Sequence, residues 1–221
     1  MEEDKDLTEY DEVDGSRVKT YDDSDTWDST TPRVTLDFQW TDDILVYASY
    51  AEGAKPGGFN GQDGAEVGKN TYDQEESNNF ELGVKSTWLG GRVLANLAVY
   101  YTDVDKIQLT TPILNPEGAL NSIVTNQGEG EVWGTEVELT WLATENLTLG
   151  ANYALADTEF TDGCDEFQWT LTSGGGRWTG DEATSADFTG NGDCSIEGNQ
   201  FPLSSKHQAA AYADWRYPMN N

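Results

Sequence analysis

The sequence predicts an all-β fold: an antiparallel up-and-down transmembrane β-barrel, of which this chain supplies about seven strands. Three observations predict it. Apolar residues recur at every second position in several segments, short and long connections alternate between those segments, and the apolar faces carry no charge. A barrel strand crosses a bilayer with about 9–11 alternating residues, so the low mean hydropathy of -0.64 does not exclude a membrane protein.

The first three predicted strands show the alternation to different degrees. The first sets four apolar residues against polar ones, and the second, residues 44–52, is aromatic and β-branched but alternates less clearly. In the third, Ser86 is the one polar interruption of the apolar face. The apolar faces of the first and third are Val34, Leu36, Phe38 and Trp40, then Phe80, Leu82, Val84 and Trp88.

Four further segments follow the same period and complete the predicted set. A helix would place such residues on all sides, whereas a strand gathers them on one face. Their apolar faces are Val93, Ala95, Leu97, Val99 and Tyr101; Trp133, Val137, Leu139 and Trp141; Leu147, Leu149, Ala151, Tyr153 and Leu155; and Ala209, Ala211, Ala213, Trp215 and Tyr217.

The connections alternate regularly between short and long. Short turns are predicted at 41–43, at Gly90-Gly91 and at 143–146, and long loops at 53–76, 103–130 and 158–205. Membrane barrels keep short turns on the periplasmic side and long loops outside. We therefore expect residues 1–30 to be an acidic extracellular loop or tail, 31–217 to be barrel, and 218–221 to be a truncated periplasmic turn. Tryptophans near strand ends would form interfacial girdles.

Charge and composition exclude several classes of protein. The net charge is -29, which repels phosphate backbones and excludes nucleic acid as a partner. No run of 18 apolar residues occurs, so no membrane-spanning helix is predicted. The N-terminus lacks a basic region followed by an apolar stretch, so an exported protein would need a signal upstream.

Period two also permits a soluble antiparallel sheet whose inner face carries the same residues. The alternative function is then a secreted β-sandwich carbohydrate-binding module, with tryptophan and tyrosine stacked on sugar rings. Detergent dependence and heat-dependent gel mobility separate the two hypotheses.

Neither catalysis nor a resident cofactor is expected. No GxSxG, HExxH or phosphate loop occurs, and Glu136 and Glu138 are explained as carboxylates facing the barrel lumen. The sole histidine, His207, has no cysteine or second histidine nearby in sequence and is expected to lie at a surface or in the lumen. The start of a calcium loop at 187–192 fails because Gly198 stands where a ligand glutamate is needed, so no metal site is expected.

Four stretches occur in an order that resembles TonB-dependent outer-membrane receptors. They are Leu45-Val46-Tyr47-Ala48-Ser49-Tyr50-Ala51-Glu52-Gly53-Ala54-Lys55-Pro56-Gly57-Gly58-Phe59-Asn60, then residues 79–86, 97–108, and 124–128 with 134–139. The resemblance covers about residues 32–157. It implies a barrel of about 22 strands in the outer membrane of a Gram-negative bacterium, filled by an N-terminal plug. It further implies import of a scarce nutrient, such as a ferric siderophore, vitamin or glycan, with energy relayed through TonB.

The chain departs from that design. It lacks the plug, the energy-coupling box and most strands, and Ala54 stands where the family commonly has an aromatic residue. The expected partners are outer-membrane lipid, a small-molecule ligand and, through the missing N-terminal region, the TonB complex. A partial barrel leaves two unpaired edges, so the isolated chain should not fold stably, and a cooperative thermal transition without detergent would contradict this.

Candidate binding and cross-linking residues lie in the predicted extracellular loops. Lys55 and Phe59 flank glycines whose backbone freedom suits a ligand-contacting loop, although a purely structural strand exit is equally compatible. Cys164 and Cys194 are the only cysteines, and an oxidising cell surface favours a disulfide between them. Two free thiols remain the alternative.

Overall fold

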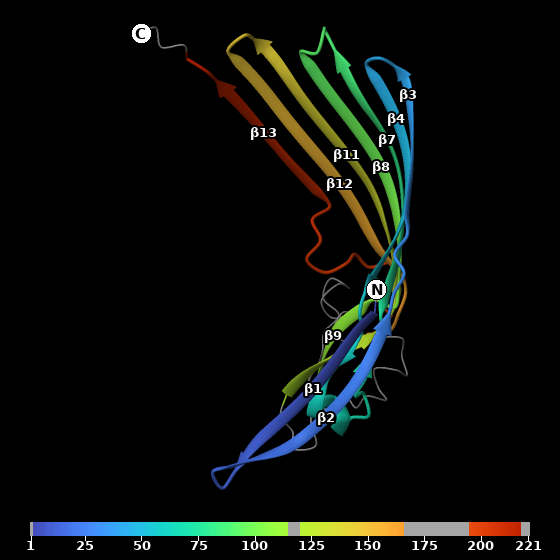
Figure 1. The fold of residues 1–221 in the computed structure, drawn as a ribbon, viewed down its shortest axis with the longest axis vertical. Helices are drawn as coiled ribbons and strands as arrows, with labels where there is room; N and C mark the ends of the chain where they lie inside the picture. The colour runs from blue at the N-terminus through green and yellow to red at the C-terminus, as the bar shows by residue number, and fades with distance from the viewer. Residues whose placement is uncertain (1, 115–119, 166–194, 218–221) are drawn as a thin grey trace.

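One antiparallel sheet forms the main body of the protein (Figure 1). The computed structural model describes residues 2–114, 120–165 and 195–217. In these, seven strands are arranged in the order β13-β12-β11-β8-β7-β4-β3 and every neighbouring pair is antiparallel, which confirms the predicted fold class. The strands are β3 (Arg33–Thr41), β4 (Ile44–Lys55), β7 (Glu75–Trp88), β8 (Val93–Asp105), β11 (Glu129–Thr144), β12 (Leu147–Asp162) and β13 (His207–Trp215).

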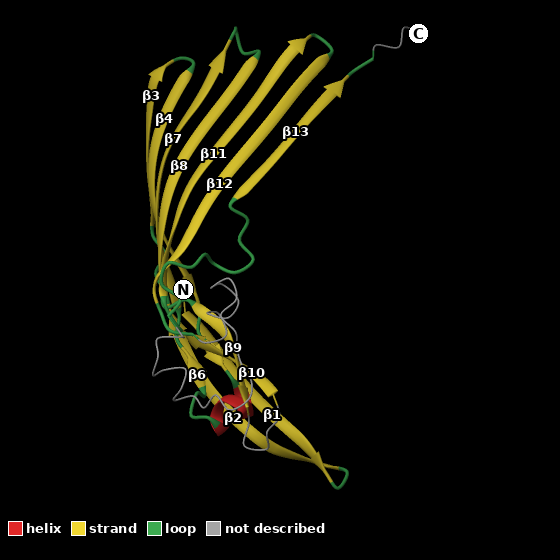
Figure 2. Ribbon diagram, turned by 180° about the vertical axis from the view of Figure 1, so that it is seen from behind, coloured by secondary structure: helices red, strands yellow, loops and turns green. Residues whose placement is uncertain are grey.

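Short turns and long loops lie at opposite ends of this sheet (Figure 2). The predicted turns at 41–43 and 143–146 shorten to two residues each, because Thr41 pairs with Ile44 and Thr144 with Leu147 across bulges. The Gly90-Gly91 prediction was too short. Trp88 pairs with Val93, so four residues connect the strands, and Leu89 shares the positive φ of the two glycines.

The strands run further into the long loops than predicted. β4, β8 and β12 extend into the predicted loops 53–76, 103–130 and 158–205, to Lys55, Asp105 and Asp162. Charged residues interrupt the apolar alternation there, but antiparallel backbone hydrogen bonds do not depend on side-chain polarity. The side-chain pattern therefore marks where the apolar face ends, and the backbone ladder continues beyond it.

The predicted loops carry secondary structure of their own. Residues expected to form an acidic loop or tail fold as a hairpin of β1 (Glu2–Val13) and β2 (Ser16–Asp28). The first long loop, 53–76, holds β5 (Gly58–Phe59), α1 (Gly61–Glu66) and β6 (Thr71–Tyr72). The second long loop, 103–130, holds β9 (Gln108–Leu114) and β10 (Leu120–Asn126). We call these elements, with residues 106–107, 127–128, 158–165 and 195–206, the loop cap; they gather at the end away from the short turns (Figures 1 and 2).

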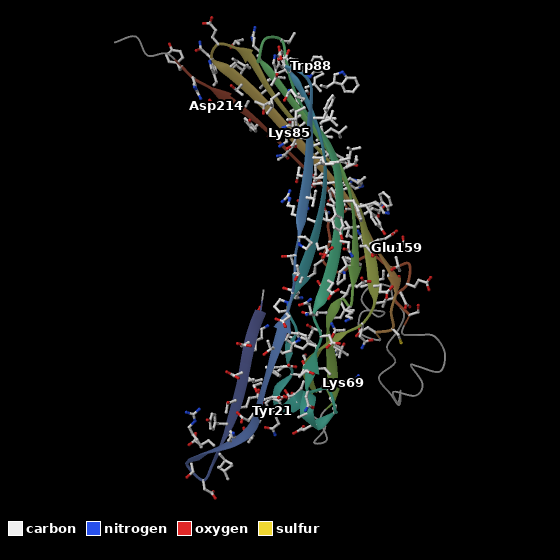
Figure 3. All side chains as sticks on the ribbon, turned by 45° about the vertical axis from the view of Figure 1, so that its right-hand side comes forward. Tyr21, Lys69, Lys85, Trp88, Glu159 and Asp214 are labelled. Atoms are coloured by element: carbon white, nitrogen blue, oxygen red, sulfur yellow. The ribbon has the colours of Figure 1, made fainter. Side chains whose placement is uncertain are left out.

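The register aligns the predicted apolar faces into one continuous surface. Leu36 lies opposite Ala48, Val84 opposite Leu97, and Val137 opposite both Leu97 and Tyr153. We call this the outer face. Figure 3 shows the sheet as a curved wall, with Trp88 and Glu159 on its convex side. In the described part of the chain, no helix is long and apolar enough to cross a membrane.

The outer face is exposed in this structure. Leu36 is 72% exposed and Phe38 66%, values that a β-sandwich would reduce by packing a second sheet on the same face. Among the described residues no sheet covers it, because the three further sheets are two-stranded and belong to the loop cap. The β-sandwich alternative is therefore not supported.

Candidate functional site

The inner face of the sheet is polar. Tyr47 Oη donates to Glu81 Oε1 at 2.5 Å, and Asn96 Nδ2 donates to Glu138 Oε2 at 3.0 Å. Glu136 and Glu138 alternate onto this face, where we expected them. A hollow of about 460 Å³ lies here, and its polar lining is Tyr47, Lys85, Asn96, Glu136, Glu138, Asn152 and Gln208. The inner face thus offers hydrogen-bond donors and acceptors and charges of both signs, whereas the middle of the outer face is apolar.

Three tyrosines cross this inner face over glycines of neighbouring strands. Each tyrosine lies directly opposite its glycine, and a β-carbon added at any of these glycines would overlap the tyrosine ring. Sequence reasoning missed these pairs, although a glycine inside a strand is a signal for close approach of another group. The pairs are Tyr47–Gly83, Tyr100–Gly134 and Tyr212–Gly150.

The loop cap contains the buried hydrophobic core of the described structure. Phe160 and Ile196 are fully buried, and they pack with Ile107 and Leu109 from a different loop. The ring centroids of Phe160 and Phe201 lie 4.7 Å apart. The predicted loops 103–130 and 158–205 therefore pack on each other through buried apolar side chains. Loops that lay separately on the surface would leave such side chains exposed.

Amide side chains connect the loops further. Asn60 donates to the carbonyl of Val124 at 2.8 Å and accepts from its N–H at 2.7 Å. Gln108 Nε2 lies within hydrogen-bonding distance of the carbonyls of Lys55, Pro56 and Asp73. The first long loop is therefore fixed to the second by contacts that bridge more than fifty residues of sequence.

The N-terminal hairpin packs on the first long loop. Lys5 Nζ donates to the carbonyl of Gly57 at 2.7 Å, and the N–H of Gln62 donates to Glu9 Oε2 at 2.7 Å. The Trp27 and Phe59 rings meet edge to face with centroids 5.4 Å apart. The loop therefore has its conformation fixed from two sides.

The predicted ligand-binding residues both lie at the loop-cap end of the sheet. Lys55 ends β4 with an exposed side chain, and Phe59 is half-buried against Trp27. The surroundings of the two side chains differ. Phe59 already has an aromatic partner within the chain, whereas the side chain of Lys55 is exposed. Their contact with a ligand stays a prediction.

Three titrating groups in the hairpin are perturbed. Burial, assisted by a hydrogen bond to Asp23, raises the pKa of Tyr21 to about 12. The hydrogen bond between Lys19 and Asp22, 2.6 Å long, raises the pKa of Lys19 and lowers that of Asp22. The pKa shift of Tyr21 reflects docking of the hairpin, since burial is its main cause. The shifts of Lys19 and Asp22 come from a local ion pair on the exposed surface of the hairpin.

The cysteine and metal predictions fall partly outside the described residues. Cys164 is disulfide-bonded and Cys194 lies outside them, so the pairing of the two stays a prediction. Residues 187–192, the failed calcium-loop pattern, also lie outside. Within the described ranges, no group of three or more His, Cys, Asp or Glu side chains is arranged to hold a metal ion. His207 lies at the start of β13 and its Nδ1 is 2.8 Å from Tyr153 Oη.

Known sequences similar to this chain are receptors. The family profile described as "TonB dependent receptor-like, beta-barrel" matches residues 6–221. The ferric-pyoverdine 358 receptor of Pseudomonas putida is 30% identical over 135 residues, which are 60% of this chain and 16% of that protein. The metal-pseudopaline receptor CntO of Pseudomonas aeruginosa is 29% identical over 133 residues, 60% of this chain and 17% of that protein. The chain thus spans less than a fifth of the length of these relatives.

Solved structures share the fold. The ferric yersiniabactin uptake receptor FyuA from Yersinia pestis superposes with a TM-score of 0.64 at 18% identity, covering 97% of this chain and 27% of that one. The ferric-catecholate import receptor Fiu from E. coli gives a TM-score of 0.57 at 17% identity, covering 92% and 24%. In both, the matching part is about a quarter of the receptor.

Proposed function

The chain belongs to the family of TonB-dependent receptors, and from that premise we propose that it forms part of the wall of an outer-membrane receptor importing a scarce nutrient such as a ferric siderophore. One observation carries the proposal beyond family membership. The seven-stranded sheet places outward a face that is apolar and uncharged across the middle of the sheet, a polar face inward and all long loops at one end. A transport barrel needs these three properties together, since lipid, ligand path and ligand entrance lie on different sides of its wall.

The outer face fits the hydrocarbon region of an outer membrane. Rows of apolar side chains continue from strand to strand without a charged residue in the middle of the sheet. Outward-facing arginine or lysine at mid-bilayer costs about 2–4 kcal/mol, so the absence of charge is what insertion requires. Localisation in the outer membrane of a Gram-negative bacterium follows as part of the proposal.

The loop cap and the inner face would supply the ligand path. The relatives named above are receptors for metal or iron chelates. A bulky polar chelate would bind better to the hydrogen-bonding groups of the inner face than to a purely apolar pocket. Lys55 and Phe59 are the proposed contacts at the entrance, with Lys55 suited to an anionic chelate. Coupling to TonB would depend on a region outside this chain. The family consists of transport receptors, and we propose no catalytic role.

Uptake by the intact receptor tests the proposal. A strain lacking the full gene should lose uptake of one radio-iron siderophore from a panel, and the plasmid-borne gene should restore it. A Lys55→Gln variant should weaken binding of that siderophore by about tenfold, the value of one charged hydrogen bond. The matched control is Lys19→Gln, because Lys19 lies on the exposed hairpin surface and is paired with Asp22. A full-length product that stays monodisperse without detergent would contradict the proposal.

A further inference from the structure

The ammonium group of Lys55 forms no ion pair with any described residue. Glu75 lies directly opposite Lys55 in the register of β4 and β7, so it is the carboxylate best placed to pair with it. The Glu75 side chain is engaged elsewhere, because its Oε2 accepts the backbone N–H of Gln108 at 2.7 Å. The exposed Lys55 side chain is therefore available to an anion from outside the chain.

Donors within the chain occupy the backbone carbonyl oxygens at and after Lys55. Gln108 Nε2 lies 3.2 Å from the carbonyl oxygen of Lys55 and 3.0 Å from that of Pro56. Lys5 Nζ donates to the next carbonyl, that of Gly57, at 2.7 Å. Carbonyl oxygens carry partial negative charge and would repel an anionic ligand if they were left bare. With these three oxygens bonded, the Lys55 ammonium is the charge that this stretch offers to a ligand.

The core of the loop cap holds the backbone around Gln108 in place. Its neighbours Ile107 and Leu109 are buried in that core, at 8% and 6% exposure. Side chains of successive extended residues point to opposite sides, so the Gln108 side chain lies on the other side from the core, where it meets Lys55 and Pro56. The first long loop therefore takes its position from the core of the second.

A second amide side chain completes this attachment. Asn126 lies directly opposite Gln108 across β9 and β10. Its Nδ2 donates to the carbonyl of Asp73 at 2.9 Å, and its Oδ1 accepts the N–H of Asp73 at 2.6 Å. Gln108 Nε2 lies 3.0 Å from the same carbonyl. We call Gln108 and Asn126 the amide clamp, because this cross-strand pair ties both ends of the first long loop to β9 and β10.

We propose that the amide clamp positions the side chain of Lys55 to bind an anionic group of the imported ligand. Gln108 is a positioning residue, since it contacts the backbone of Lys55 and leaves the ligand contact to the ammonium group. A cation that is held in place before binding loses less conformational freedom on association, which strengthens binding. The inference rests on the proposed function, in which Lys55 is a ligand contact at the entrance.

A double-mutant cycle in the full-length receptor tests the clamp. The probe is the radio-iron siderophore whose uptake the plasmid-borne gene restores. Gln108→Met keeps the length of the side chain and removes its donors, so this siderophore should bind about fivefold more weakly. In the Lys55→Gln background the same change should weaken binding by less than about twofold, because the cation that the clamp positions is already gone. A purely structural role of Gln108 would instead weaken binding about equally in both backgrounds.

Gln39→Met is the matched control. Gln39 Nε2 lies 2.6 Å from the carbonyl oxygen of Thr41 and 3.2 Å from that of Ile44, so the change removes the same kind of hydrogen bond at the short-turn end of the sheet. It should leave siderophore affinity unchanged, and heat-dependent gel mobility checks that each variant assembles. A second measurement needs no variant. Bound siderophore should protect Lys55 of the unaltered receptor from an amine-reactive label, while Lys19 continues to react.

Equal weakening by Gln108→Met in the two backgrounds, or no weakening in either, would overturn the inference. Full labelling of Lys55 in the siderophore complex would overturn it as well, even if a variant failed to assemble. If Lys55→Gln weakens binding and Gln108→Met does not, the clamp alone is refuted. If the full gene restores uptake of no siderophore in the panel, the proposed function is refuted and the inference with it.

Discussion

The sheet and the loop cap treat the same kinds of side chain in opposite ways. In the sheet, Phe38 is 66% exposed and Leu36 72%, while in the cap Phe160 and Ile196 are fully buried. The two regions are continuous along the same strands, since β12 carries Tyr153 of the outer face and Phe160 of the cap core. One strand thus passes from a region whose apolar side chains are exposed into a region whose apolar side chains are buried.

Different forces stabilise the two regions in consequence. The cap buries apolar area within the chain, so the hydrophobic effect of water acts on it as in an ordinary globular domain. The outer face of the sheet buries little apolar area within the chain. In the proposed membrane setting, the sheet therefore depends on its backbone hydrogen bonds and on the lipid. The same kind of substitution should therefore change stability differently in the two regions.

The largest effect is expected from truncating the same residue type in the two regions. Phe160→Ala should destabilise the cap by about 3–5 kcal/mol, because it leaves a cavity among Ile107, Leu109 and Ile196. Phe38→Ala, which removes an equal ring from the outer face, should cost clearly less because no protein cavity forms. Hydrogen exchange of residues 106–128 in the full-length receptor measures the stability of the cap. If the two variants lost equal stability, the outer face would have to be buried against protein.

Charge on the two faces of one strand should give the next largest effect. Leu97→Arg places a cation in the middle of the outer face and should cost about 2–4 kcal/mol or prevent assembly. Asn96→Arg places it on the inner face, where Glu138 lies within reach, and should be tolerated. Heat-dependent gel mobility reports assembly. A receptor that tolerates both substitutions equally would refute the assignment of the faces.

A smaller effect should follow from crowding a tyrosine on the inner face. Gly134→Ala forces the Tyr100 ring from its place and should cost about 1–3 kcal/mol. Adding Tyr100→Ala should recover part of that cost, because the two residues share one contact. Denaturant unfolding in detergent gives the double-mutant cycle. If the two costs simply add, the packing of ring on glycine contributes nothing to the sheet.

The smallest effect concerns pH and the hairpin of the cap. The pKa of Tyr21 is raised to about 12, so the folded state keeps the hydroxyl protonated where the unfolded chain would already lose its proton. This contribution to stability is fully present below pH 10 and is lost as pH rises toward 12. Hydrogen exchange of residues 2–28 should accelerate over that range in the unaltered receptor, and Tyr21→Phe should remove the Tyr21-dependent part. An identical pH profile in the variant would contradict the docking of the hairpin.

Much of the sheet could be predicted from the sequence because its outer face follows a period of two. Leu36, Leu82 and Leu97 reveal their face locally, and the register then only aligns what each strand already shows. The strand ends could not be placed, because Asp103 and Glu131 end the apolar pattern while the backbone ladder continues. The four-residue turn at 89–92 was missed because Leu89 adopts a positive φ that the sequence does not indicate.

The cap was largely unpredictable for the opposite reason. Phe160 and Ile107 meet through long-range packing of loops, and no short periodic pattern marks either residue as buried. The hairpin of β1 and β2 is built from acidic residues with low strand propensity and was therefore expected to be a loop or tail. Of the candidate ligand contacts, the family-like stretch identified Lys55 and Phe59, but nothing in the sequence indicated that Trp27 packs on Phe59.

A residue-by-residue scan along β8 in membranes tests whether one face of the sheet meets lipid and the other does not. Nitroxide labels placed singly at positions 94–100 of the full-length receptor report their accessibility to oxygen, which concentrates in lipid, and to a polar nickel chelate, which does not. We expect high oxygen accessibility at Ala95, Leu97 and Val99 and low values at Leu94, Asn96, Ala98 and Tyr100. Equal accessibility of neighbouring positions, or chelate access at Leu97, would contradict the assignment of an outer, lipid-facing side.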